Sequence, residues 1–84
     1  MKEIDVIAFF DKKGDINPLR FRFCENNTEE NKVIPVHKIL TKKQEFLNGN
    51  IMYVFECQSL INDINKLYAI KYEINKNRWY LCKI

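Results

Sequence analysis

Hydrophobic and polar residues alternate with a period of two along most of this chain. Such alternation is typical of β-strands, because successive side chains of a strand point to opposite faces of a sheet. The pattern predicts six strands joined by short polar turns. The predicted strands span Ile4–Phe10, Leu19–Cys24, Lys32–Leu40, Ile51–Gln58, Leu67–Ile74 and Arg78–Ile84.

The segment RFRF lies in the clearest of these strands. Leu19, Phe21 and Phe23 are expected to point inward, and Arg20 and Arg22 to point outward. The first predicted strand differs, since apolar residues occupy both of its faces near its end. Strands of that kind are usually covered on both sides, so we expect the same here.

Between the third and fourth strands, TKKQEFLNG predicts the one helical element. Thr41 followed three positions later by Gln44 matches a capping box. Asn48 and Gly49 suit the left-handed conformation that ends a helix. We therefore expect one or two helical turns over Lys42–Leu47.

The short turns predict that neighbouring strands pair in an antiparallel meander, with a polar loop at Glu25–Asn31. Six short strands leave two unpaired edges unless the sheet curls or closes. The chain length fits one domain over residues 1–84. The expected all-β fold is a small barrel or a strongly bent sheet, with one short helical turn between the third and fourth strands.

The charge distribution and the targeting signals indicate which partner and which compartment to expect. Up to Asn31 the chain has five basic and seven acidic residues, and from Lys32 onward it has nine basic and four acidic ones. The excess of positive charge suits an anionic partner, although the codon usage of an AT-rich genome also enriches lysine. The sequence shows neither an export signal nor an apolar stretch of membrane-spanning length, which predicts a cytoplasmic protein without membrane contact.

Catalytic and metal-binding patterns are weak. Cys24, Cys57, Cys82 and His37 have the composition of a zinc site, but they lack the closely spaced ligand pairs of structural zinc sites. Ser59 is the single serine and lies outside any nucleophile motif. We therefore expect no enzyme activity, no metal and no cofactor.

The C-terminal segment NRWYLCKI leaves two interpretations open. A short loop at Asn75–Asn77 would put Tyr80 on the face of Tyr72 and its apolar neighbours, and Trp79 on the face of Lys71. If that second face is exposed, Trp79 is a stacking platform for nucleic-acid bases. If the predicted helix covers it, Trp79 is a core residue, and this is the interpretation that we favour.

These observations predict a non-enzymatic binding domain. Its expected partner is a protein, or a second copy of the chain joined through a strand edge. The alternative is a nucleic-acid-binding accessory domain with a basic and aromatic strand face. The candidate binding residues are Arg20, Arg22, Lys71, Arg78, Trp79 and Lys83.

Three segments carry a resemblance to known proteins: EIDVIAFFDKKGDINPLRFRF, ECQSLIN and KYEINKNRWYLCKI. Together they look like an uncharacterised group of bacterial all-β proteins of about 80 residues. Members of that group tend to be encoded on mobile elements or near genes for translesion polymerases. The resemblance implies a role in DNA maintenance or in mobile elements, and it implies no site residues.

Overall fold

The computed structural model describes residues 1–24 and 30–83, apart from the side chains of residues 47 and 83. Most of the predicted loop Glu25–Asn31 and the final residue of the sixth predicted strand, Ile84, lie outside this part of the chain. The described residues form seven strands. They are β1 (Lys2–Phe10), β2 (Ile16–Cys24), β3 (Asn31–Pro35), β4 (Lys38–Leu47), β5 (Asn50–Ile61), β6 (Ile64–Glu73) and β7 (Arg78–Lys83).

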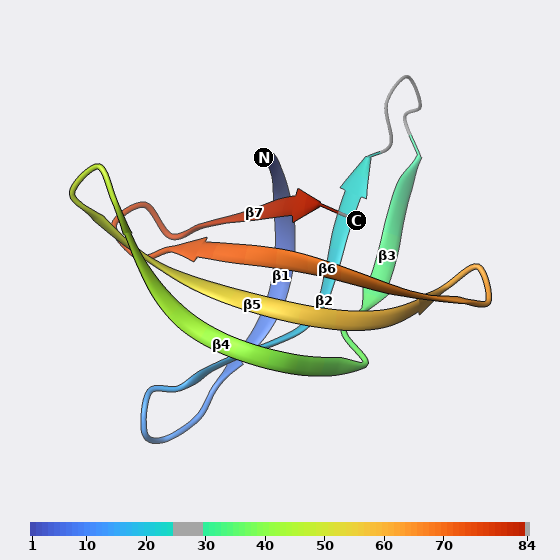
Figure 1. The fold of residues 1–84 in the computed structure, drawn as a ribbon, viewed down its shortest axis with the longest axis horizontal. Helices are drawn as coiled ribbons and strands as arrows, with labels where there is room; N and C mark the ends of the chain where they lie inside the picture. The colour runs from blue at the N-terminus through green and yellow to red at the C-terminus, as the bar shows by residue number, and fades with distance from the viewer. Residues whose placement is uncertain (25–29, 84) are drawn as a thin grey trace.

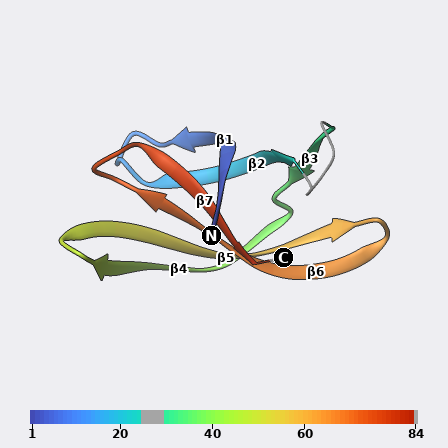
Figure 2. The ribbon, with the colours of Figure 1, turned by 90° about the horizontal axis from the view of Figure 1, so that it is seen from above.

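The strands form one antiparallel sheet with the order β3-β2-β1-β7-β6-β5-β4, which curls into a half-barrel (Figure 1). Seen from above, β1 to β3 form one layer and β4 to β6 the other, and β7 passes between the two (Figure 2). The predicted all-β, strongly bent antiparallel sheet is confirmed. The predicted single meander is replaced by two shorter ones, β1–β3 and β4–β7, which the pairing of β1 with β7 joins.

The predicted helical turn over Lys42–Leu47 was wrong. This segment belongs to β4 and pairs with β5 as far as the turn. Asn48 and Gly49 both have positive φ, 51° and 81°, and form a two-residue hairpin turn. Asn-Gly is the preferred sequence for such a turn because both positions require left-handed backbone. The hydroxyl of Thr41 caps no helix and donates to the carboxylate of Glu56 across the strand pair (2.8 Å).

The third predicted strand, Lys32–Leu40, is two strands separated by a corner. The first ends at Pro35 and the second begins at Lys38, so two consecutive strands lie at opposite edges of the sheet. Proline has no N–H with which to continue a ladder, which favours a break there. His37 holds the corner, because its Nδ1 accepts a hydrogen bond from the backbone N–H of Leu60 (2.9 Å).

The hydrophobic core lies between the two layers. Phe55, Cys57 and Ile70 are fully buried there, and Phe21 packs against Tyr68 with 5.4 Å between ring centroids. Among the described side chains, each strand except β4 contributes at least one buried residue to this cluster. Its members are Ile4, Ile16, Phe21, Ile34, Phe55, Cys57, Tyr68, Ile70, Trp79 and Leu81. No part of the described chain forms a helix long and apolar enough to cross a membrane.

A polar contact at Ser59 joins β3 to β5 and β6. The hydroxyl of Ser59 donates to the backbone carbonyl of Pro35 (2.7 Å) and shares a hydrogen bond with the hydroxyl of Tyr68 (2.6 Å). Ser59 is fully buried. Tyr68 is buried as well, so the two hydroxyls depend on this contact for their hydrogen bonds.

Replacing Ser59 with alanine is expected to lower the free energy of unfolding by about 1–3 kcal/mol, because the buried hydroxyl of Tyr68 and the carbonyl of Pro35 lose their partner. Urea denaturation measures the change. In the double variant Ser59→Ala/Tyr68→Phe, the second substitution should cost less than Tyr68→Phe costs alone, since the hydroxyl it removes is already without its partner. A Ser59→Ala protein within about 0.5 kcal/mol of the parent would contradict the expectation.

Candidate functional site

Trp79 lies in the core. Its side chain is 9% exposed, and its ring packs against Tyr72 and Phe55 with centroid distances of 4.8 and 5.8 Å. It pairs with Ile4 of β1 on one side and with Tyr72 of β6 on the other. The ring therefore has no free face on which a nucleic-acid base could stack.

The predicted facing of β7 was wrong by one residue. The turn between Glu73 and Arg78 contains four residues, whereas a three-residue loop was expected. A one-residue change of register moves every side chain of a strand to the opposite face. Tyr80 therefore lies opposite Lys71, and its hydroxyl donates to the buried carboxylate of Glu73 (3.0 Å). This hydrogen bond raises the pKa of Tyr80.

The two candidate cations with described side chains on β6 and β7, Lys71 and Arg78, are paired with carboxylates. The Lys71 ammonium lies 2.9 Å from the Glu45 carboxylate, and only 19% of the Lys71 side chain is exposed. Arg78 forms an ion pair with Glu3 at 3.1 Å. The side chain of Lys83 lies outside the described part of the chain. Neither described pair offers a free positive charge to a phosphate.

The two candidate arginines of β2 differ in their surroundings. Arg22 binds one carboxylate oxygen of Asp5 through Nε (3.2 Å) and Nη2 (2.8 Å). Arg20 is exposed and has no hydrogen-bond or ion-pair partner among the described residues. Arg20 therefore keeps its full capacity to bind an anion, with five N–H donors in a planar arrangement.

Exposed apolar side chains surround Arg20 on the outer face of β1, β2 and β3. Ile7, Phe9, Leu19 and Val33 are each between 51% and 59% exposed. We call these four residues together with Arg20 the Arg20 surface. Single exposed apolar residues are common, but four on adjacent strands around one arginine form a patch.

A β-bulge in β2 builds this surface. Ile7 pairs with Arg20 and Ala8 pairs with Pro18, so Leu19 is an extra residue without a partner on β1. A bulge of this kind turns a side chain away from the ladder. Leu19 therefore lies on the outer face, where half of it is exposed, and the prediction that it points inward with Phe21 was wrong.

The prediction that both faces of the first strand are covered was also wrong, since Ile7 and Phe9 are uncovered on the outer face. The apolar residues on both faces of that strand were the sequence signal for this surface. An open hollow of about 330 Å³ lies beside Ile7, Arg20 and Val33 of this surface. The hollow is lined by Asp5, Val6, Ile7, Arg20, Phe21, Arg22 and Val33.

Among the described residues there is no activated nucleophile and no metal-binding group. Burial raises the pKa of the Cys57 thiol to about 12, so that this thiol stays protonated at neutral pH. Cys24 is exposed and Cys82 is partly buried, on different strands. Within the described ranges, no three histidine, cysteine or acidic side chains gather closely enough to hold a metal ion.

Comparison of the chain with protein-family models, with curated proteins and with solved structures finds no match. The resemblance to small bacterial all-β proteins therefore stays a prediction.

Proposed function

We propose that this protein is a non-enzymatic interaction module that docks a protein partner on the Arg20 surface. Outward positions of an antiparallel sheet are normally polar when that face meets water. Here Ile7, Leu19 and Val33 occupy such positions and remain half exposed. Apolar side chains around a central arginine are the composition found at the centres of protein interfaces. This unpartnered patch is the observation that supports the proposal.

The chemistry of the surface favours an acidic protein segment over a nucleic acid. Arg20 has no counter-ion among the described residues, and a carboxylate of the partner can bind its guanidinium in a bidentate manner. A phosphate backbone needs a row of free cations, but the nearest arginine, Arg22, is paired with Asp5. The aliphatic residues suit apolar side chains of a partner and provide no stacking surface for bases.

The first test is site-specific photo-crosslinking in the native cell. A photoreactive amino acid at Leu19 is expected to capture one protein reproducibly. The same group at Leu67, an equally apolar and 66% exposed position on β6, is the matched control and is expected not to capture it. Capture of the same protein from both positions would contradict docking on the Arg20 surface.

The second test measures the affinity for the captured protein. Arg20→Glu is expected to weaken binding by about 30-fold or more, because it places a carboxylate where the partner presents one. Stability should stay within about 0.5 kcal/mol of the parent, since the side chain is exposed. Unchanged affinity would overturn the proposal. Steeply salt-dependent binding of a nucleic acid that Arg20→Glu abolishes would assign the surface to nucleic acid instead.

A further inference from the structure

The outer side of β4 is an unpaired strand edge. β4 is ten residues long, ends the sheet order, and pairs with β5 alone among the described strands. A long free edge offers a row of N–H and C=O groups to another strand. We propose that β4 pairs with β4 of a second copy of this chain, antiparallel and about a two-fold axis at Gln44. This dimer leaves the Arg20 surface free and does not depend on the function proposed for it.

The hairpin turn determines which backbone groups point to the free edge. The residues that flank a two-residue turn form a hydrogen-bonded pair, and such pairs alternate along an antiparallel ladder. Leu47 pairs with Asn50, so Leu47, Glu45 and Lys43 direct their backbone groups toward β5. The N–H and C=O groups of Lys42, Gln44 and Phe46 consequently point outward. A second strand can pair with these three residues.

Among axes from Lys42 to Glu45, the charges along β4 favour one register. If the two copies form one continuous sheet, residues that lie opposite each other across the junction point to the same face of that sheet. The two-fold axis then passes through one residue position, and that residue lies opposite its own counterpart in the second copy. An axis at Lys42 or Lys43 would set two lysines against each other, and an axis at Glu45 would set two glutamates together. An axis at Gln44 puts Lys43 opposite Glu45 of the second copy, twice. Opposite charges across a strand pair stabilise it and like charges destabilise it.

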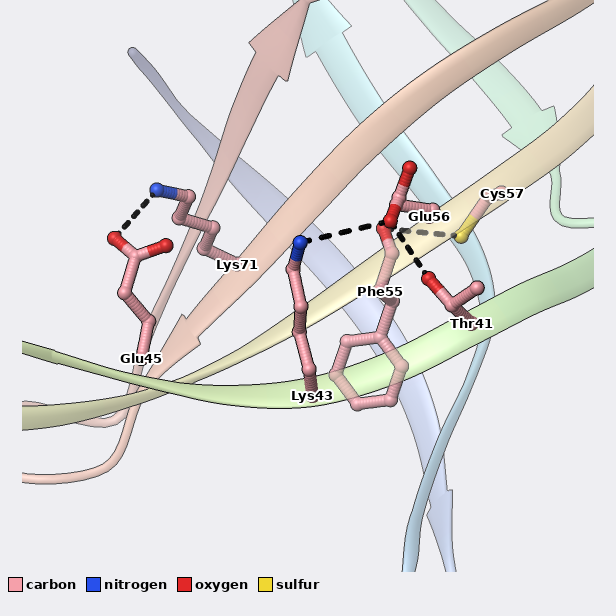
Figure 3. A network of polar contacts seen from close by, with 7 residues as sticks. All are labelled: Thr41, Lys43, Glu45, Phe55, Glu56, Cys57 and Lys71. Carbon is pink, nitrogen blue, oxygen red and sulfur yellow. Dashed lines mark hydrogen bonds and ion pairs between the residues drawn. The ribbon is translucent and has the colours of Figure 1, made fainter.

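The existing ion pairs extend this arrangement. Glu45 binds Lys71 at 2.9 Å, and Lys43 lies 3.7 Å from Glu56 (Figure 3). The side chains of Lys43 and Glu45 thus lie on the same face of β4. In the dimer, Glu56 and Lys43 of one copy continue into Glu45 and Lys71 of the other. These four charges of alternating sign form a row across the junction, and the two-fold axis generates a second such row.

The opposite face of β4 also gains from this register. Phe46 is 73% exposed, more than any other large hydrophobic residue in the described part of the chain. An axis at Gln44 puts Phe46 opposite Lys42 of the second copy. Lys42 already lies above the rings of Tyr53 and Phe55, at 5.3 and 5.7 Å from their centroids. Its aliphatic stem can cover Phe46 while its ammonium stays near the aromatic rings.

Sedimentation equilibrium from about 10 µM to about 1 mM tests the dimer, because a single strand pair makes a small and weak interface. Lys43→Glu and Glu45→Lys are each expected to weaken the dimer about tenfold or more, since each sets like charges opposite each other. The double variant Lys43→Glu/Glu45→Lys restores opposite charges across the junction and should bind more tightly than either single variant. It should stay weaker than the parent, because it sets like charges beside Glu56 and Lys71 within each copy. A protein that is monomeric throughout this range would overturn the proposal, as would a dimer that either single variant leaves unchanged.

Disulfide cross-linking tests the register. Gln44 lies opposite itself, and its Cα atoms should be about 5.5 Å apart, within the range that a disulfide spans. In a Cys24→Ser background, Gln44→Cys should form a cross-linked dimer on mild oxidation. Lys42→Cys should not, because four positions separate it from its own counterpart along the paired strands. Cross-linking of Lys42→Cys without that of Gln44→Cys would overturn the register.

Discussion

Trp79→Ala is expected to lower the free energy of unfolding by about 3–5 kcal/mol, because it removes a large buried ring and leaves a cavity. Trp79 is packed against Tyr72 and Phe55 and lies where β7 joins the two layers. Small domains have little stability to lose, so the variant should be largely unfolded at room temperature. Near-ultraviolet circular dichroism and urea denaturation report the change.

Two controls accompany this variant. Trp79→Phe retains an aromatic ring and should lose about half as much stability or less. Leu67→Ala removes an exposed apolar side chain and should stay within about 0.5 kcal/mol of the parent. A folded Trp79→Ala protein as stable as Leu67→Ala would show that the ring lies outside the core.

Raising the pH from 8 to 11 is expected to lower the free energy of unfolding by about 4 kcal/mol through two buried groups alone, Cys57 and Tyr68. Burial raises the pKa of Cys57 from 9.0 and that of Tyr68 from 10.0, each to about 12. Both groups therefore keep their proton in the folded state at a pH where the unfolded chain releases it. Their contribution to stability is fully present below pH 9 and is lost as the pH rises toward 12.

Cys57→Ala isolates the larger part of this effect. At neutral pH the variant should be less stable than the parent, because the side chain is fully buried. Between pH 8 and 11 it should lose about 3 kcal/mol less than the parent does, since the thiol no longer ionises on unfolding. Urea denaturation at each pH gives both values. Parallel pH curves for parent and variant would contradict the buried thiol as the cause.

Strand alternation predicted the greater part of the fold. Phe21, Phe55, Ile70 and Tyr68 all follow the period of two, and all are buried in the strands expected for them. This signal is reliable because a strand half covered by a core must separate its apolar and polar residues onto two faces. Antiparallel pairing and curling then follow from short turns and from the need to limit free edges.

Two of the wrong predictions, the helix and the facing of β7, lie next to turns, because one short turn sequence is compatible with two structures. Asn48-Gly49 supplies left-handed backbone, which ends a helix or closes a hairpin equally well. The alternation of Lys42, Gln44 and Phe46 along β4 is weak, so that only pairing with β5 decides between the two. The turn after Glu73 shows the same difficulty, since its length fixes the face of Trp79 and cannot be read from alternation.

The candidate site was predicted in part. Arg20 was predicted to point outward, and within the described ranges it is the arginine without an ion-pair partner. The pairing of Lys71 and Arg78 with carboxylates depends on contacts between segments far apart in the sequence. The bulge at Leu19 leaves no local pattern, because it exists only relative to the partner strand.

The pairing of β1 with β7 has a consequence for synthesis of the chain on the ribosome. Ile4 pairs with Trp79, which is polymerised roughly 4–15 s later at typical rates of translation. Until then β1 to β3 can form only a small sheet without its opposite layer, which is marginally stable in water. The nascent chain therefore presents Phe21 and Ile34 to solvent for seconds. Chaperones that bind extended apolar segments have that interval in which to engage it, and folding then proceeds after release through slow non-local pairing.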